Sequence, residues 1–422
     1  MSSQPQNQKD SAHKSSHPNA LQPIPRAIWI LGFMMFSLNL SFLMVYSFSG
    51  IYLKTLLGVS TTWIGLLEGT IEATSFLLKL LSGIFSDYLR RRKPLLVLGY
   101  VLSAFSRLLL GLACSFGLVF AARLMERIGN GLQSTPRDAM VADIAPPRRI
   151  GASYGLKRSL GQAGAFLGGA VGILAMWWTS NDFQQVFWLA SIPAFIALSI
   201  LIFMVKEPKR YDHPAVSAEI PLPVPKSRPK MRWSNLRLLG QSFWLLMVVN
   251  AIFMLSRMSE TFLILHAHGN FGLKVTYAPL VMMVFNAAWC GVSYPVGVLA
   301  DRMNRYWFLA IGIIFIVLAD IVLASALSLP VFFIGVALWG VQYGITQNIF
   351  LSLIVESVPE NLRGTGLGCY YIILATSAFF ADLGAGAISE HYGEAYAFTT
   401  SGVIALCSLL TLMVIMGYKK KK

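Results

Sequence analysis

The segment Gly83-Ile-Phe-Ser-Asp87 closes one long apolar run, and Gly297-Val-Leu-Ala-Asp301 closes another, 214 residues further along the chain. A second segment recurs at nearly the same offset, because Asp143-Ile-Ala-Pro146 returns as Glu356-Ser-Val-Pro359 after 213 residues. Both recurrences fall at the same side of matching apolar runs. The sequence therefore predicts two repeated halves, each built from the same series of segments.

The apolar runs themselves are long enough to cross a lipid bilayer, which takes about 20 residues of helix. Only helices and closed barrels satisfy their backbone groups in lipid, and these runs are too long and continuous for barrel strands. We therefore predict an all-α polytopic membrane protein, with twelve transmembrane helices in two pseudo-symmetric six-helix bundles. The predicted helices are 28–49, 63–85, 95–114, 117–142, 153–178, 184–206, 240–264, 275–300, 306–327, 330–356, 364–388 and 395–417.

The composition excludes an ordinary soluble protein and identifies the bilayer as the main partner. Hydrophobic residues make up 55% of the chain, and only 13% are charged, against roughly 25% charged residues in soluble domains. The net charge of +15 would suit a nucleic-acid partner. However, the basic residues lie in short loops between apolar runs, which is the charge pattern of a membrane protein. We expect no nucleic-acid partner.

Lysine and arginine also predict the orientation in the membrane. The loops on one side carry nearly all the loop lysines and arginines, whereas the other side has only Lys54 and Lys274. Basic loops stay in the cytoplasm, so both termini are expected there, in the inner membrane of a bacterial cell. The predicted order is a disordered N-terminus 1–27, a bundle 28–206, a proline-rich linker 207–239, a bundle 240–417 and a basic tail 418–422.

The repeated segments carry a family resemblance that covers nearly the whole chain. They resemble the loop signature Gly-x-x-x-Asp-Arg/Lys-x-Gly-Arg-Arg of the major facilitator superfamily, with Tyr88, Arg90 and Asn304 as departures. Arg123 stands at the arginine of that superfamily's fourth-helix motif. The resemblance implies a secondary transporter whose halves rock about a central site, with a charged cytoplasmic gate. The implied gate residues are Gly83, Asp87, Arg91, Arg92, Gly297, Asp301, Arg302 and Arg305.

Three ionisable residues of the second predicted helix, Glu68, Glu72 and Lys79, share one face with small and polar residues. A charge at bilayer depth is costly, so this face is expected to line a wet interior. Glu68 and Glu72 repel at a spacing of four residues, so one of them is expected to carry a proton and to couple transport. The alternative is an ion pair with an arginine of another helix. Coupling predicts that Glu72→Gln abolishes uphill transport.

Two further helices repeat a spacing of three residues between an arginine and a glutamate. In the fourth, Glu126 is expected to pair with Arg123, leaving Arg127 to contact the solute. The seventh carries Arg257 and Glu260 at the same spacing. The family resemblance places both helices beside the central path.

Other polar residues within the runs complete the set of candidates. Asp320 in the ninth helix is expected to have a structural partner. His266 and His268 lie at the outer end of the seventh, as plain loop histidines or as sensors of external pH. The remaining candidates for the central cavity are Asn39, Arg107, Asn250 and Asp382.

Glycines in the fifth helix predict close helix packing. Gly164, Gly168, Gly169 and Gly172 stand near one another at the spacing that lets two helices approach. The stretch is similar to the superfamily's antiporter motif, but Ala165 replaces the motif proline. Packing alone explains these glycines.

Taken together, these patterns predict a monomeric secondary transporter of a small organic solute that is coupled to protons through its carboxylates. Uptake of a metabolite or siderophore and efflux of a drug-like compound are both open. No phosphate-binding loop, cofactor motif or metal-binding pattern is present in the sequence. A membrane-embedded enzyme would need a cluster of catalytic groups that we do not see. A non-transporting receptor or scaffold on the same fold is the alternative.

Overall fold

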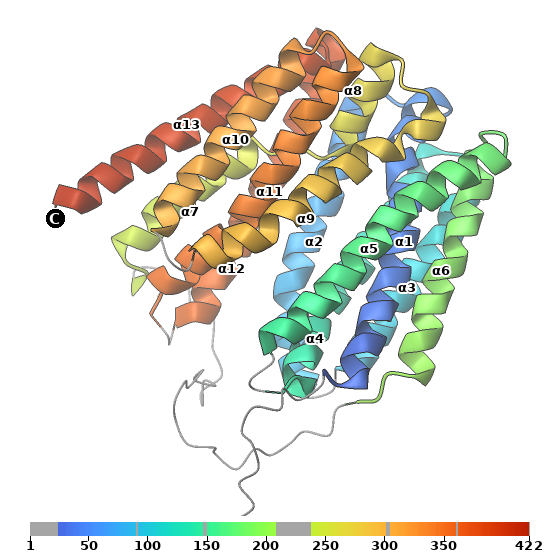
Figure 1. The fold of residues 1–422 in the computed structure, drawn as a ribbon, viewed down its shortest axis with the longest axis horizontal. Coiled ribbons are helices and arrows are strands. Elements are labelled where there is room, and N and C mark those ends of the chain that lie inside the picture. The colour runs from blue at the N-terminus through green and yellow to red at the C-terminus, as the bar shows by residue number, and fades with distance from the viewer. Residues whose placement is uncertain are drawn as a thin grey trace, which may run out of the picture.

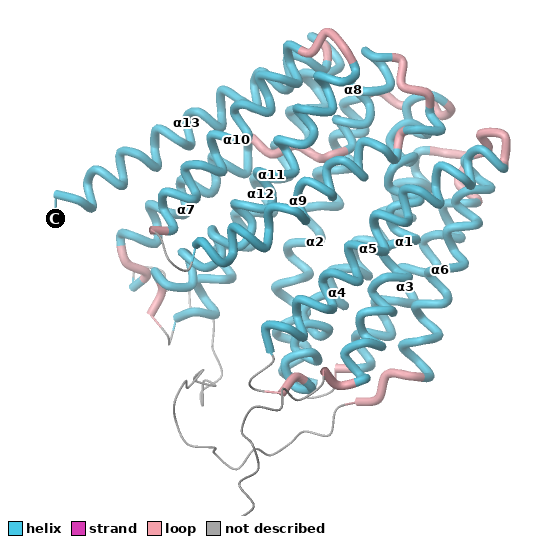
Figure 2. Tube along the Cα trace, viewed as in Figure 1, coloured by secondary structure: helices cyan, strands magenta, loops and turns pink. Residues whose placement is uncertain are grey.

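The computed structural model describes residues 24–89, 92–146, 150–207, 238–300, 304–359 and 362–421. All regular structure in these ranges is helical (Figure 2). Most of the predicted N-terminus 1–27 and linker 207–239 lies outside them. So do three predicted gate residues, Arg91, Asp301 and Arg302. Gly83, Asp87 and Gly297 lie in described helices, but their side-chain environments are outside the described set.

The N-terminal half consists of six helices, which correspond to the first six predicted runs. Their bounds are α1 Arg26–Thr55, α2 Thr61–Leu89, α3 Lys93–Gly111, α4 Phe116–Ile144, α5 Ile150–Trp178 and α6 Phe183–Phe203.

The C-terminal half repeats this series with one helix divided in two. Its elements are α7 Gln241–Leu255, α8 Thr261–Phe271, the short 3-10 helix η3 Val275–Tyr277, α9 Pro279–Ala300, α10 Arg305–Ser325, α11 Leu329–Ser357, α12 Arg363–Tyr392 and α13 Glu394–Lys421. The last helix therefore continues through most of the segment expected to be a basic tail.

The helices fit the prediction of twelve membrane spans. Within the ranges that the structure describes, nine helices are long and apolar enough to cross a membrane. The helices α2 and α4 are equally long but carry ionisable residues near their middle, and α7 with α8 makes the seventh span. Large apolar side chains such as Phe203, which is 82% exposed, and Leu174 face outward. An outer surface of this kind is suited to lipid rather than water.

The seventh span is broken, so the prediction of one continuous helix over 240–264 is wrong. The helix α7 ends at Leu255 and α8 begins at Thr261. Side chains of other helices satisfy backbone groups in the gap: the Ser259 N–H donates to Asp382 Oδ1 at 2.5 Å, and Ser401 Oγ donates to the carbonyl oxygen of Ser256 at 2.5 Å. A non-helical backbone at membrane depth is tolerated where protein supplies such partners.

The two halves contact each other through the pairs α2 with α12, α1 with α8, and α5 with α9. We call the end that holds the loops after α2, α4, α6, α9 and α11 the linker face, and the other end the far face (Figure 1). Near the far face, α2 packs on α12. A Cβ on Gly65 would overlap the carbonyl oxygen of Asp382, and Gly386 is similarly close to the carbonyl of Thr61. The ribbons separate toward the linker face.

The repeat seen in the sequence is also a repeat of contacts at the linker face. Arg92 forms an ion pair with Asp143 at 3.0 Å in the N-terminal half. In the C-terminal half Arg305 pairs with Glu356, and these two residues follow the first pair by 213 positions each. Both pairs join the start of one helix to the end of the next. The two predicted gate arginines that the structure describes thus hold contacts within each half.

The glycines of α5 allow it to lie directly against α1. A Cβ on Gly164 would overlap the Phe36 carbonyl oxygen, and a Cβ on Gly168 would lie 2.5 Å from that of Leu40. Gly169 instead faces Met283 of α9, in the other half. Gly172 faces Phe48, with its Cβ position 3.3 Å from that ring. The stripe therefore serves helix packing on two sides.

Candidate functional site

A cavity of about 570 Å³ lies between the two halves. Its walls come from both halves, and its volume is within the range of small-molecule sites. The halves touch near the far face at Gly65 and Asp382, and the lining residues continue from there toward the linker face as far as Lys79 and Arg137. Among the predicted cavity residues, Arg123 is set behind the wall. The others line it: Asn39, Glu68, Glu72, Lys79, Arg107, Glu126, Arg127, Asn250, Arg257, Glu260 and Asp382.

Glu68 and Arg123 form a buried ion pair between α2 and α4. Arg123 Nη2 lies 2.9 Å from Glu68 Oε1, and the two side chains are 1% and 3% exposed. Arg123 Nη1 also donates to Ser49 Oγ of α1 at 3.1 Å. The pair ties three helices together, which fits the alternative that the sequence left open for Glu68.

Glu126 pairs with α3 rather than with its own helix. Arg107 Nη2 lies 3.1 Å from Glu126 Oε1, and both side chains are buried. The predicted pair of Glu126 with Arg123 is therefore wrong. Arg123 is already bound to Glu68 on the other side of α4, and a partner on a facing helix gives each charge its own counter-ion.

Arg127 is also paired, so the prediction that it is left free for a solute is wrong. Its Nη1 lies 3.5 Å from Glu72 Oε2, and its guanidinium lies 5.5 Å from the centre of the Phe42 ring. The Glu72 side chain keeps 33% of its surface exposed. Every carboxylate of the N-terminal half that lines the cavity thus has its own arginine.

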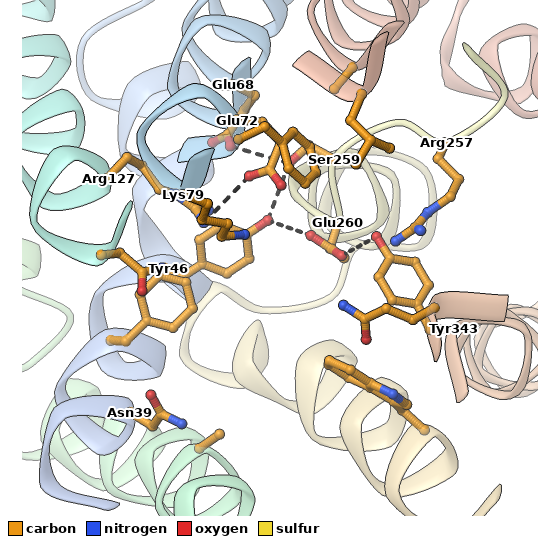
Figure 3. Close-up of a pocket in the computed structure, with 18 of the residues that line it drawn as sticks. Asn39, Tyr46, Glu68, Glu72, Lys79, Arg127, Arg257, Ser259, Glu260 and Tyr343 are labelled. Carbon is orange, nitrogen blue, oxygen red and sulfur yellow. Dashed lines mark hydrogen bonds and ion pairs between the residues drawn. The ribbon is translucent and has the colours of Figure 1, made fainter. Parts of the chain in front are cut away.

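A chain of hydrogen bonds connects this half to the C-terminal half through the gap between α7 and α8 (Figure 3). Ser259 Oγ donates to Glu68 Oε2 at 3.2 Å, and Thr261 Oγ1 donates to Glu68 Oε1 at 3.0 Å. From α1, the Tyr46 hydroxyl donates to Glu260 Oε2 at 3.0 Å. The broken span therefore places polar groups of the second half against the charges of the first.

Glu260 receives hydroxyl donors on both of its oxygens. Besides Tyr46, the Tyr343 hydroxyl of α11 donates to Glu260 Oε1 at 2.6 Å. The ring of Tyr343 carries Arg257, whose guanidinium lies 3.6 Å from the ring centre. A local ion pair between Arg257 and Glu260 is not formed, because the backbone between them is not helical and a spacing of three residues no longer places them on one face.

Asp382 is a buried carboxylate with a backbone partner. It is 2% exposed and accepts the hydrogen bond from the Ser259 N–H. No lysine or arginine of the described ranges lies within ion-pair distance of it. Asp320 is different, since it lies away from the cavity and accepts from Trp339 Nε1 at 2.9 Å, and its Oδ2 lies 2.5 Å from Ser401 Oγ. Asp320 therefore has the structural role expected of it.

The two histidines are not exposed loop residues, so that part of the prediction is wrong. Both belong to α8. His266 is buried, with Nε2 at 3.3 Å from the Leu323 carbonyl oxygen and Nδ1 at 3.0 Å from Asn270 Nδ2. His268 Nδ1 lies 2.8 Å from the Leu273 carbonyl oxygen. Both rings have partners inside the protein.

Four residues of the hydrogen-bond chain between the halves were not predicted: Tyr46, Ser259, Thr261 and Tyr343. Tyrosine, serine and threonine are common in membrane helices, and each is neutral, so none stands out by its insertion cost. One signal was available for Ser259, because the polar run Ser256-Arg-Met-Ser-Glu260 interrupts an apolar span. The two tyrosines could be found only from the spatial arrangement.

Several donors around the cavity have no acceptor within the described structure. Asn250 Nδ2, Arg257 Nε and Arg137 Nε are buried without a hydrogen-bond partner. Lys79 also lines the cavity, 4.9 Å from the centre of the Phe76 ring. Asn39 is satisfied, since its Nδ2 donates to the Gly161 carbonyl oxygen at 3.0 Å. Over the same ranges, no three His, Cys, Asp or Glu side chains come together as a metal site would require.

Comparison with known proteins agrees with the fold. Residues 30–381 match the model of the Major Facilitator Superfamily. An uncharacterised MFS-type transporter of Methanocaldococcus jannaschii is 28% identical over 399 residues, covering 93% of this chain and 95% of that protein.

Solved transporter structures share the fold at low sequence identity. A POT family transporter in complex with 5-aminolevulinic acid has a TM-score of 0.76 at 14% identity, covering 94% of this chain and 96% of that one. A nucleoside transporter has a TM-score of 0.74 at 12% identity, covering 92% and 98%. The chain thus belongs to the Major Facilitator Superfamily and is a multi-pass membrane transporter rather than an enzyme.

Proposed function

We propose that this secondary transporter moves a small organic solute across the cytoplasmic membrane by alternating access, coupled to protons. The observation that carries the proposal is the set of carboxylates in the central cavity. Five of them line it, and their hydrogen bonds cross from one half to the other. Groups that bind protons and that touch both moving parts can link protonation to the relative position of the halves.

Contacts between the halves at the far face support alternating access. The proposal is that the cavity communicates with the linker side in this state. The opposite state requires the far-face contacts to separate and the linker ends to approach each other. The repeated gate segments, which include Arg92 and Arg305, lie at those linker ends and are placed to meet there.

Asp382 is the carboxyl group that best supports a proton-carrying role. A carboxylate beside an arginine keeps its negative charge, because the cation stabilises it. Glu68, Glu72 and Glu126 each have such a partner. Asp382 has none in the described ranges, and it lies at the contact between α2 and α12 that must open. Protonation would remove its charge at the place where the halves separate.

The proposed orientation places the linker face in the cytoplasm. The loops of that face hold almost all loop lysines and arginines of the sequence, and such loops remain on the cytoplasmic side. Accessibility of single cysteines introduced at Lys274 and at Lys206 tests this directly. In intact cells a membrane-impermeant reagent should label the first and not the second.

Proteoliposomes provide the test of transport itself. The purified chain is reconstituted with a pH-sensitive dye inside, and a panel of metabolites and drug-like compounds is added under a pH gradient. We expect at least one compound to cross the membrane together with protons. Liposomes without the protein would not show this coupled movement. Compounds that bind to the purified chain without any flux would overturn the transport proposal and favour a receptor on the same fold.

A further inference from the structure

Three arginines that line the cavity, Arg137, Arg158 and Arg257, have no carboxylate within ion-pair distance in the described ranges. Arg257 is the one that lies beside aromatic side chains of the C-terminal half, and its surroundings suggest what the solute carries. Arg107, Arg123 and Arg127 are each bound to a glutamate. Arg257 lines the same cavity, and no acidic side chain of the described ranges lies within ion-pair distance of it. A cation that is partly buried without an opposite charge is costly. A bound anion would remove that cost.

The nearest acid along the chain is kept from acting as the counter-ion. Both oxygens of Glu260 accept hydroxyl groups, from Tyr46 and Tyr343. Tyr343 also holds Arg257 by stacking, so its ring and hydroxyl occupy the space between the two (Figure 3). Stacking fixes the plane of a guanidinium and leaves its N–H edge available to a planar acceptor such as a carboxylate.

A second unsatisfied donor lies on the same wall. Asn250 precedes Arg257 by seven residues, is 1% exposed and lines the cavity, and its Nδ2 has no acceptor. The Nε of Arg257 is likewise without a partner. Buried donors are usually satisfied in folded proteins, so these two open donors, which line one cavity, are available to a ligand that brings acceptors.

The surroundings of Tyr343 indicate what else the solute contains. Phe285 lies 4.9 Å and Trp289 5.7 Å from Tyr343, measured between ring centres, and all three line the cavity. Aromatic walls bind flat apolar groups by stacking and edge contacts. The cations and the aromatic rings thus occupy neighbouring parts of one cavity.

We propose that the solute is a ring-bearing organic anion whose carboxylate binds to Arg257 and Asn250, with its ring against Tyr343, Phe285 and Trp289. This inference rests on the proposed transport function, because it names the substrate class of the same cavity. Lys79 and Arg137 in the N-terminal half add positive charge to the path that the anion would take.

Chemical modification of arginines tests the site without knowledge of the natural solute. The full-length chain in detergent is treated with phenylglyoxal, and peptide mass spectrometry follows each arginine. We expect Arg257 to react, whereas Arg123, buried in its ion pair, serves as an internal unreactive control. Benzoate should slow the reaction at Arg257 about tenfold at concentrations well above a millimolar dissociation constant. Benzamide, which has the same shape without the charge, should not.

Single-residue variants show which side chain is responsible for the effect of benzoate. Benzoate should raise the melting temperature of the wild-type chain and of Lys274→Gln, a control that removes an exposed positive charge outside the cavity. It should not raise that of Arg257→Gln, and in Arg257→Lys the rise should be smaller because the planar stack is lost. If Arg257→Gln does not fold, Asn250→Leu provides the second variant, with a weaker benzoate effect expected.

The outcomes separate this inference from the transport proposal. Equal protection by benzoate and benzamide, or no protection by either, would overturn the anion site even if other solutes are transported. An effect lost in Lys79→Gln but kept in Arg257→Gln would place the anion elsewhere and would overturn it too. Protection by benzoate without flux of any solute would leave the site standing and would count against transport alone.

Discussion

The acidic residues in the two halves of the transporter are held in different ways. In the N-terminal half, Glu68, Glu72 and Glu126 each face an arginine of a neighbouring helix. In the C-terminal half, Glu260 and Asp382 are held by hydroxyl and backbone N–H donors instead. The sequence repeat is close at the linker face, yet it does not extend to the charges of the cavity.

This difference suggests a division of work between the halves. In the N-terminal half each cavity carboxylate is held by an arginine of a neighbouring helix, so its partner is fixed within that half. Neutral donors allow a carboxyl group to change its protonation state at lower cost. The C-terminal half, with an unpaired Arg257 beside these carboxyls, is accordingly the half that we expect to respond to solute and proton.

The largest expected effect is that of Asp382→Asn. Without an ionisable group at this position, proton-driven accumulation should fall to the equilibrium level, while exchange of solute across the membrane persists. Uptake under a pH gradient and counterflow without one, both in proteoliposomes, measure the two activities. Glu390→Gln is the matched control, because it changes an acid of the same helix that accepts from the Thr62 N–H and is not among the residues lining the cavity. Accumulation by Asp382→Asn at the wild-type level would contradict the proposed division.

A large effect on stability is expected in the N-terminal half. Arg107→Leu leaves Glu126 buried without its cation, which should lower the free energy of unfolding by about 3–5 kcal/mol. Replacing both residues with leucine should restore most of the loss. Thermal unfolding in detergent measures this. In the C-terminal half, Trp339→Phe removes one donor to Asp320 and should cost only about 1–3 kcal/mol. Similar losses for Arg107→Leu and Trp339→Phe would remove the contrast between the halves.

Glu72→Gln should have a moderate effect. The sequence alone predicts loss of coupling in this variant, but the structure pairs Glu72 with Arg127 at 3.5 Å in a partly exposed position. Such a pair contributes about 1 kcal/mol or less, so we now expect slower but still proton-coupled transport. Uptake under a pH gradient in proteoliposomes measures both the rate and the proton coupling of this variant. Abolished coupling in Glu72→Gln, together with normal coupling in Asp382→Asn, would transfer the proton role to the N-terminal half.

The smallest effect is expected at the far face, where the halves share an ion pair. Lys54 of α1 lies 3.0 Å from Glu394 of α13, and the lysine side chain is 38% exposed. Lys54→Gln should shift the equilibrium slightly toward the state open at the far face, by less than about 1 kcal/mol. Distances between spin labels on the far-face ends of α1 and α13 measure the shift. A complete opening would show that this pair, rather than helix packing, holds the face closed.

The sequence predicted the membrane spans, the two halves and nearly all charged residues of the cavity, because each of these follows from insertion cost and periodicity. It did not predict which charges pair. Glu126 pairs with Arg107 instead of Arg123, and this pairing depends on how α3 lies against α4. The break after Leu255 was also missed, since its stability comes from Asp382 and Ser401, which are more than a hundred residues away in sequence.

Two groups of Asp382, its carboxylate and its backbone carbonyl oxygen, make separate contacts. Its carboxylate holds the Ser259 N–H, and its carbonyl oxygen lies where a side chain on Gly65 would have to go. At Gly65 and Gly386, the surfaces that part when the far face opens therefore meet through backbone. A proton that binds to the Asp382 carboxylate therefore binds to the same residue whose backbone forms part of that contact. Protonation of Asp382 and separation of the halves would then be coupled locally, without a long path through the protein.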